Sequence, residues 1–263
     1  MKHNLSGIIL PGGGRRKWDY FRLARFAIRL VLEGKVDTPI FGICMGMQLS
    51  MLEATEMEFN EEGYILERIP GNEHVALKME ISEDSLARGD LYSDMSQRLI
   101  HNLATQNITM HSHKYSVTVK KFKDYQRYFE DLKNFKILSK TSHNQDQQTF
   151  GDIITSFQHK SKPIYGVQFH PEKISFGFPA KKENWNPESI HTKEAVEVAQ
   201  YISNFFVQKC RENWKVEYDF SEVGRAKLAR NVVNVMTPYD SKLGKYHSSL
   251  YMVNSKGELL YGS

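Results

Sequence analysis

The chain contains Phe41-Gly42-Ile43-Cys44-Met45-Gly46-Met47-Gln48, in which one cysteine stands between glycines two positions before and after it. An apolar run precedes Cys44 and a helical pattern follows it, which predicts the sharp strand-to-helix turn called a nucleophile elbow. Because glycine has no Cβ, Gly42 and Gly46 allow the turn to tighten and a carbonyl group to approach the sulfur. This stretch predicts an α/β fold that presents a thiol at the end of a strand.

A second motif offers Cys44 a base. Residues 165–173 read Tyr165-Gly166-Val167-Gln168-Phe169-His170-Pro171-Glu172-Lys173. We expect a strand over 164–169 that delivers His170 as general acid and base. Glu172, two residues on along an extended chain, would point to the same side and hold the imidazole tautomer. The histidine and the helix N-terminus after the elbow both favour a thiolate. We therefore expect a lowered pKa for Cys44 and reaction with iodoacetamide near pH 6.

A glycine-rich segment is the third expected part of the site. Pro11-Gly12-Gly13-Gly14 follows an apolar strand pattern at 5–10. The oxyanion formed on attack needs aimed N–H donors, each worth ~3 kcal/mol. We predict that the backbone N–H groups of Met45 and Gly13 supply them. Each motif alone also occurs as an ordinary turn, but together, each at a predicted strand end, they favour a cysteine hydrolase of amide bonds.

The composition narrows the possible partners. The 263 residues are 40% hydrophobic, which is enough for a substantial core. The net charge is +4, from 35 basic and 31 acidic residues that are intermixed, too even for a nucleic-acid footprint. The mean hydropathy is −0.51 and no apolar run approaches the ~18 residues of a membrane span. Two cysteines are too few for a disulfide framework, and we expect Cys210 to be a small buried hydrophobe. We expect neither nucleic acid nor a membrane as partner.

Strand and helix patterns alternate along the chain. Predicted strands cover 5–10, 39–43, 135–139, 152–157 and 164–169, and predicted helices cover 18–34, the segment after Cys44, 95–104, 122–133 and 192–211. This order predicts a mostly parallel sheet flanked by helices, with flavodoxin-like layering. The polar stretch 56–80 is expected to form loops and short antiparallel strands. We expect a hydrolase domain over 1–215 and a C-terminal extension over 216–263 that packs on it.

The order of the three motifs resembles that of the class I glutamine amidotransferase-like superfamily. Within it, the chain is most similar to the gamma-glutamyl hydrolases, peptidases that cleave folate polyglutamates. The likeness extends to His113-Lys114-Tyr115-Ser116, to Asn184-Trp185-Asn186 with the helix pattern at 201–207, and to Arg15-Arg16 followed by Tyr20. The resemblance implies hydrolysis of γ-glutamyl amide bonds in folyl-poly-γ-glutamates through a thioester, with no metal and no cofactor.

The resemblance also assigns roles and a setting. It implies Cys44 as nucleophile, His170 as general acid–base and Glu172 as its orienter. Family members often dimerise and usually reach the lysosome, the vacuole or the exterior. No signal peptide is visible here, so the chain taken literally would be cytoplasmic.

Residues outside the three motifs are expected to contact the substrate. The resemblance implies a substrate-site role for His113. Arg15 and Arg16 could bind glutamate carboxylates by bidentate pairing. A structural histidine and a solvated charge pair are the alternatives at these positions.

Two features depart from the family pattern. Gln48 stands where gamma-glutamyl hydrolases often carry Glu, and Gln is commoner in glutamine amidotransferases. The chain starts almost directly on the strand at 5–10, so we expect an N-terminally truncated domain that lacks strand–helix units and exposes a sheet edge. A glutaminase-type amidotransferase domain and a truncated inactive homologue, a pseudoenzyme, are therefore the alternative functions.

Overall fold

The computed structural model describes residues 5–13, 18–57, 65–87, 89–142, 151–176, 191–213, 251–253 and 259–261. The chain divides into two compact units, residues 1–214 and 215–263. In the second unit, β11 (Tyr251–Val253) and β12 (Leu259–Tyr261) pair antiparallel. Every other element belongs to the first unit.

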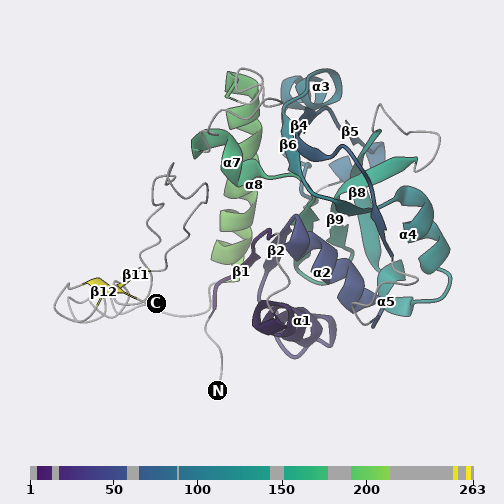
Figure 1. Cartoon of the computed structure of the whole chain (residues 1–263), viewed down its shortest axis with the longest axis vertical. Coiled ribbons are helices and arrows are strands. Elements are labelled where there is room, and N and C mark those ends of the chain that lie inside the picture. Colours follow the sequence, from purple (N-terminus) through teal and green to yellow (C-terminus); the bar gives the residue numbers. More distant parts are fainter. Residues whose placement is uncertain are drawn as a thin grey trace. The chain divides into compact units, whose positions relative to one another are not determined.

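A six-stranded sheet runs through the first unit in the order β1-β2-β10-β9-β8-β5 (Figure 1). Its strands are β1 (Ile8–Leu10), β2 (Ile40–Ile43), β10 (Ile164–Val167), β9 (Asp152–His159), β8 (Phe135–Ser142) and β5 (Glu80–Ile81). The β1–β2 and β2–β10 pairings are parallel, and the other three are antiparallel. The predicted α/β class is confirmed, but the sheet is mixed rather than mostly parallel. The segments joining β8 to β9 and β9 to β10 are shorter than the dozen or so residues that a parallel crossover requires.

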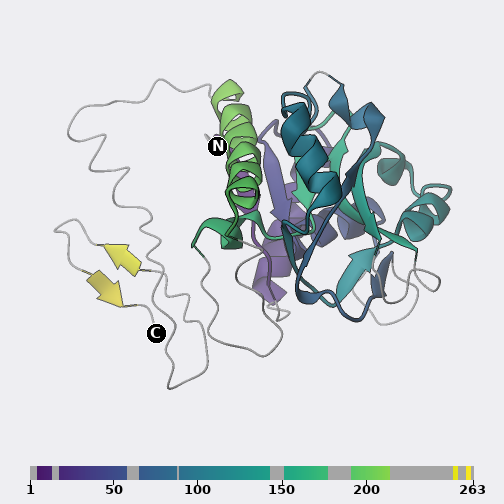
Figure 2. The ribbon, with the colours of Figure 1, turned by 90° about the horizontal axis from the view of Figure 1, so that it is seen from above.

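Helices cover both faces of the sheet (Figures 1 and 2). One face carries α1 (Trp18–Leu32), α2 (Met45–Ala54), α4 (Val119–Tyr125) and α5 (Glu130–Lys133), and the other carries α3 (Gln97–Thr105), α7 (Pro171–Phe176) and α8 (Lys193–Glu212). Successive side chains of a strand point to opposite faces of the sheet. In β2, Ile40 packs with α1 and α2, whereas Phe41 packs with α8.

The single helix predicted over 122–133 is two helices, α4 and α5, separated after Tyr125. Phe122 and Leu132 are both buried. Ten positions apart, they would lie about a quarter-turn from each other on one continuous helix. The break lets both side chains face the same core.

The polar stretch after α2 contributes short antiparallel pairs, as predicted. β3 (Leu66–Arg68) pairs with β7 (Tyr115–Val117), and β4 (Glu73–Leu77) pairs with β6 (Thr109–Ser112). A 3-10 turn, η1 (Glu83–Leu86), follows β5. Among the described residues, no helix combines the length and apolar character needed to cross a membrane.

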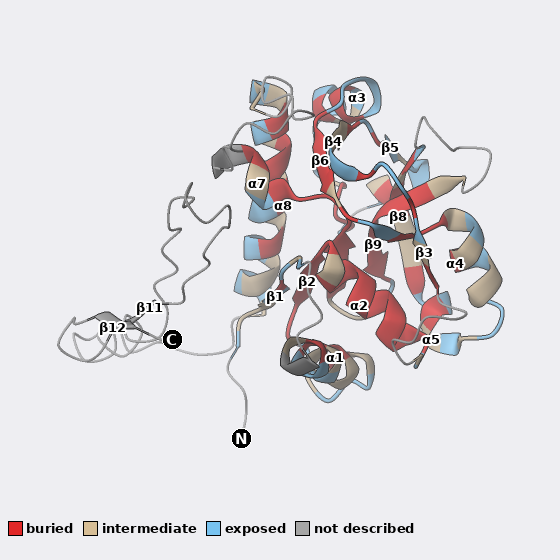
Figure 3. Cartoon of the chain, in the orientation of Figure 1, coloured by how far each residue is buried: buried red, intermediate tan, exposed pale blue. Residues whose placement is uncertain are grey.

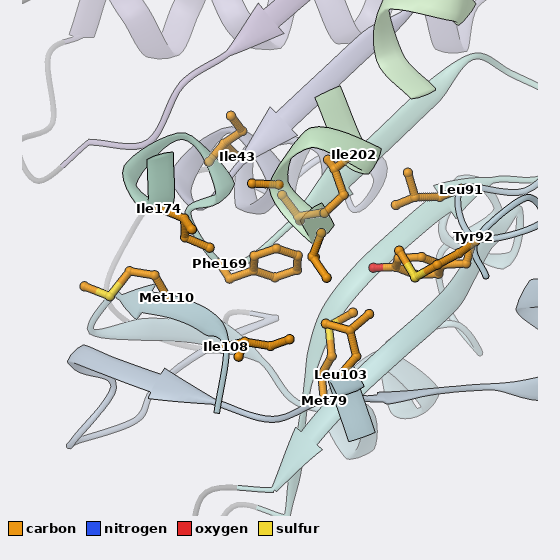
Figure 4. Close-up of a cluster of buried hydrophobic side chains, with 14 of the residues drawn as sticks. Ile43, Met79, Leu91, Tyr92, Leu103, Ile108, Met110, Phe169, Ile174 and Ile202 are labelled. Carbon is orange, nitrogen blue, oxygen red and sulfur yellow. The ribbon is translucent and has the colours of Figure 1, made fainter. Parts of the chain in front are cut away.

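Buried residues, red in Figure 3, lie in the strands and on the helix faces that cover the sheet, and exposed residues lie on the outer faces of the helices and in loops. Figure 4 shows the cluster on the α8 face, in which Phe169 lies between Ile43, Ile174 and Ile202. Burying such a side chain typically contributes about 1.5–3 kcal/mol. Because Phe169 directly precedes His170, this packing anchors the backbone that carries the histidine.

A buried carboxylate joins the two helices nearest Cys44. Glu53 of α2 has 6% of its side chain exposed and bonds to two arginines of α1. Its Oε1 lies 2.6 Å from Arg29 Nε, and its Oε2 accepts a hydrogen bond from Arg25 Nε. Two guanidinium groups compensate the desolvation of one carboxylate. The sequence analysis did not find this clamp.

The first turn of α2 lies directly against β1. A Cβ built on Gly46 would stand 2.0 Å from the carbonyl oxygen of Leu10, a distance that no packing tolerates. A Cβ on Gly42 would meet the Gly46 backbone at 2.6 Å. The two glycines that flank Cys44 therefore permit the close approach of strand and helix.

We expect Gly46→Ala to lower the free energy of unfolding by about 3 kcal/mol or more, because the added methyl group meets backbone that cannot move. Gly13→Ala is the matched control, since its methyl group would meet only the mobile end of Met45, at 2.8 Å. Urea unfolding of both variants measures the difference. Equal losses in the two variants would contradict the close-approach argument.

Candidate active site

Three parallel strands end at one edge of the sheet, and a part of the predicted site follows each. The register aligns Leu10 with Gly42 and Gly42 with Gly166. β2 lies between β1 and β10, so Cys44 lies between the glycine loop after β1 and the loop that leads to His170 (Figure 1). The carboxyl edge of parallel strands is where α/β proteins place their sites.

Cys44 adopts a backbone conformation that is rare for a residue with a side chain. Its φ is 51° and its ψ is −105°, and only 4% of the residue is exposed. Its N–H donates to the Val167 carbonyl at 2.8 Å, and its own carbonyl accepts from Gln48 N at 3.0 Å. These bonds to β10 and α2 hold the residue at positive φ, a state that costs about 1–3 kcal/mol at functional sites.

The strain predicts an unusual order of stability for two substitutions. We expect Cys44→Gly to be more stable than Cys44→Ala by about 1 kcal/mol, because glycine relieves the positive φ and offsets its own greater chain entropy. The same pair at Cys210, within α8, should show the reverse order, since glycine weakens a helix. Thermal melts of the four variants make the comparison. A higher melting temperature for the alanine variant at both positions would contradict the backbone strain at Cys44.

The structure brings Cys44, His170 and Glu172 together. A Cβ built on Gly12 would lie 2.7 Å from His170 Cε1 and 3.2 Å from Cys44 Cβ, so the two side chains lie close together beside Gly12. His170 Nδ1 lies 2.6 Å from Glu172 Oε1. A carboxylate only accepts, so Nδ1 carries a proton and donates it to Glu172. Nε2 is buried and has no hydrogen-bond partner among the described residues.

The reason given for the position of Glu172 was wrong, although the contact exists. β10 ends at Val167, and α7 begins at Pro171. Glu172 therefore reaches His170 from the first turn of a helix rather than along an extended strand.

The thiol of Cys44 is not activated in the way the sequence predicted. The pKa of Cys44 is raised to about 11, chiefly by burial and to a smaller extent by the Glu172 carboxylate. A hydrogen bond from Met45 N–H, the charge of Lys173 and the Gln168 side chain lower it, but they do not offset burial. The resting site therefore holds a neutral thiol, and the proton of Cys44 must leave as the sulfur attacks.

This pKa sets the pH dependence of alkylation. The thiolate is the reactive form, so the rate of Cys44 labelling by iodoacetamide should rise roughly tenfold per pH unit from pH 7 to pH 10. Peptide mass spectrometry resolves Cys44 from Cys210, and an unstructured cysteine peptide provides the ordinary profile. A rate that levels off below pH 8 would contradict the raised pKa and restore the thiolate expected from sequence.

Of the two predicted oxyanion donors, the Met45 N–H acts on the Cys44 sulfur and lowers its pKa. Gly13 lies against the end of the Met45 side chain, and its role as a donor stays a prediction. Tyr20 OH donates to the Pro11 carbonyl at 2.7 Å and so ties α1 to the glycine loop. Burial raises the pKa of Tyr20 to about 12, which keeps the hydroxyl a donor.

Two glutamines that sequence reasoning did not place in the site complete its floor. Gln48 Nε2 donates to the Tyr115 carbonyl at 2.7 Å and to Gln168 Oε1 at 3.2 Å. Gln168 is fully buried. The sequence signal for Gln168 was its position as a polar residue between Val167 and Phe169, directly after a buried strand.

His113 lies in a buried hydrogen-bonded chain. Its Nε2 is 2.9 Å from His111 Nδ1, and its Nδ1 is 2.9 Å from Ser116 Oγ. Both ring nitrogens are thus engaged, as in a structural histidine, and its substrate role stays a prediction. Arg15 and Arg16 lie outside the described residues, as does Asn184-Trp185-Asn186. No group of three or more His, Cys, Asp or Glu in the described part of the chain could hold a metal ion.

Comparison with known proteins identifies the family. Residues 1–181 match the sequence profile described as Glutamine amidotransferase class-I. The chain belongs to the class I glutamine amidotransferase family.

Several curated relatives carry one name. Gamma-glutamyl hydrolase of Homo sapiens is 30% identical over 220 residues, which cover 80% of this chain and 61% of that protein. Gamma-glutamyl hydrolase of Rattus norvegicus is 28% identical, with 80% and 61% covered. Gamma-glutamyl hydrolase 1 of Arabidopsis thaliana is 26% identical, with 80% and 56% covered. The resemblance seen in the sequence is confirmed, and the chain spans less than two thirds of these relatives' length.

Proposed function

We propose that the protein is a cysteine hydrolase that cleaves γ-glutamyl amide bonds of folyl-poly-γ-glutamates. The observation that carries the proposal is that Cys44 and His170 both lie against the Cβ position of Gly12, with His170 Nε2 buried and unpartnered among the described residues. The names of the curated relatives support the γ-glutamyl bond as the target. Lys173, a cation near enough to the thiol to lower its pKa, suits a substrate rich in carboxylates.

Acylation begins from the neutral thiol. The Cys44 sulfur attacks the γ-carbonyl carbon while its proton passes to His170 Nε2, and Glu172 stabilises the imidazolium through Nδ1. The N–H groups of Met45 and Gly13 receive the oxyanion. The C–N bond then breaks, the leaving amine takes the proton from Nε2, and a thioester to Cys44 remains.

Deacylation reverses the proton path. A water molecule attacks the thioester carbonyl and gives its proton to His170 Nε2. The C–S bond breaks, the carboxylic acid product departs, and the cysteine sulfur regains the proton from His170. No external redox partner or metal enters this balance.

A glutaminase-type amidotransferase is the second candidate. The family profile and Gln48, which is commoner in glutamine amidotransferases than in gamma-glutamyl hydrolases, both favour it. Its chemistry at Cys44 would be the same, with ammonia as the leaving group. The two candidates differ in the leaving group on the γ-carbonyl carbon, which is ammonia for a glutaminase and the amine of the next glutamate for a γ-glutamyl hydrolase.

The test is glutamate release from a pteroyl-penta-γ-glutamate, followed by chromatography of the shortened products. We expect release by the full chain, loss of about 10³-fold or more in Cys44→Ala, and loss of about 10²-fold or more in His170→Asn. Cys210→Ala removes the other cysteine, in α8, and should keep the parent rate.

L-Glutamine is assayed in parallel. Ammonia release from glutamine, without action on the polyglutamate, would replace the proposal with the glutaminase. Neither activity in a protein that melts cooperatively would identify an inactive homologue.

A further inference from the structure

Gln168 lies beside Cys44 across the parallel β2–β10 ladder. The register pairs Val167 with Ile43, and the Cys44 N–H donates to the Val167 carbonyl, which belongs to the peptide unit that joins Val167 to Gln168. Gln168 N–H in turn donates to Thr155 on β9 at 2.8 Å. The backbone of Gln168 is thus held on both sides, and its fully buried side chain cannot leave the site edge.

A backbone carbonyl sets the orientation of the amide groups. The Tyr115 carbonyl can only accept, so the end of Gln48 that faces it must be the NH₂ group. The second N–H of that group points to Gln168 at 3.2 Å, so the atom it meets must be Oε1. The remaining end of the Gln168 amide is therefore Nε2. The usual ambiguity between amide O and N does not arise here.

Gln168 Nε2 lacks a proper acceptor. It is buried and forms no hydrogen bond of good geometry among the described residues, a state that typically costs about 1–3 kcal/mol. The Gln168 side chain also lowers the pKa of Cys44, so it acts on the sulfur. A neutral thiol is a weak acceptor, whereas a thiolate is a strong one. A negative charge on the sulfur would satisfy this amide.

We infer that Gln48 and Gln168 form an amide relay that aims an N–H at the Cys44 sulfur and stabilises its thiolate. Gln168 is the donor, and Gln48 is a positioning residue that acts only through Gln168. The inference rests on the proposed function for the role of Cys44 as nucleophile. In that reaction, the relay assists the departure of the sulfur when the thioester breaks.

The test is Cys44 alkylation between pH 7 and pH 11, which needs no substrate and therefore stands whether or not the hydrolase activity is found. We expect Gln168→Met to slow labelling about tenfold at pH 9, which is one unit of pKa. Gln48→Met should slow it several-fold, because Gln168 loses the bond that orients it. The double variant should match Gln168→Met alone, since coupled residues are not additive. The deficits should narrow toward pH 11.

Controls separate the relay from general damage. Gln158→Met removes another buried glutamine, which bonds Asp90 on the far side of β9, and should leave the Cys44 profile unchanged. Cys210 labelling reports on folding in each sample. Should Gln168→Met not fold, Gln168→Glu keeps the bond from Gln48, lacks the N–H, and should slow labelling at pH 9. Parent-like labelling in the Gln168 variants, or additive losses in the double variant, would overturn the relay.

Discussion

The parallel register of β1, β2 and β10 is the constraint on which the site depends. It places Leu10, Gly42 and Gly166 side by side, so that three chain segments leave the sheet at one edge. The helix after β2 must then begin against the end of β1, and only a glycine at position 46 leaves room for the Leu10 carbonyl. The strained turn at Cys44, the glycine loop beside it and the approach of His170 all follow from this geometry.

Burial fixes the positions of Cys44 and His170 and also makes the thiol harder to deprotonate. A thiol inside the protein has a pKa far above that of a free cysteine, because desolvation penalises the thiolate more than nearby donors favour it. The structure holds a base instead of a preformed anion: His170 Nε2 is unpartnered among the described residues and its ring is oriented by Glu172. We therefore expect Cys44 to lose its proton only when substrate is bound, as the bond between sulfur and carbon forms.

The parts of this molecule that local sequence encodes were predictable. An apolar run, a glycine-flanked cysteine and a helical pattern specify the elbow, and strand ends specify which edge carries the site. The antiparallel pairing of β10, β9, β8 and β5 was not predictable, because a pattern of apolar residues does not show in which direction two strands pair. The pKa of Cys44 depends on burial by segments distant in sequence. Glu53 and Gln168 read as ordinary polar residues until folding brings Arg29 and Gln48 to them.

The segment that carries β6 and β7 contains a buried chain of hydrogen-bonded side chains near the site. Thr109 donates its hydroxyl proton to the Leu77 carbonyl, so it must accept from His111 Nε2. His111 Nδ1 lies 2.9 Å from His113 Nε2, and His113 Nδ1 lies 2.9 Å from Ser116 Oγ.

Two backbone carbonyls of the same segment accept hydrogen bonds from residues of the site. The Met110 carbonyl accepts the His170 N–H at 2.7 Å, and the Tyr115 carbonyl accepts from Gln48 at 2.7 Å. One strand thus positions the base, and the next orients the relay toward the nucleophile. The side chains of Thr109, His111, His113 and Ser116 form a hydrogen-bonded chain that links β6 to β7. His113 therefore belongs to the segment whose backbone carbonyls accept from both His170 and Gln48.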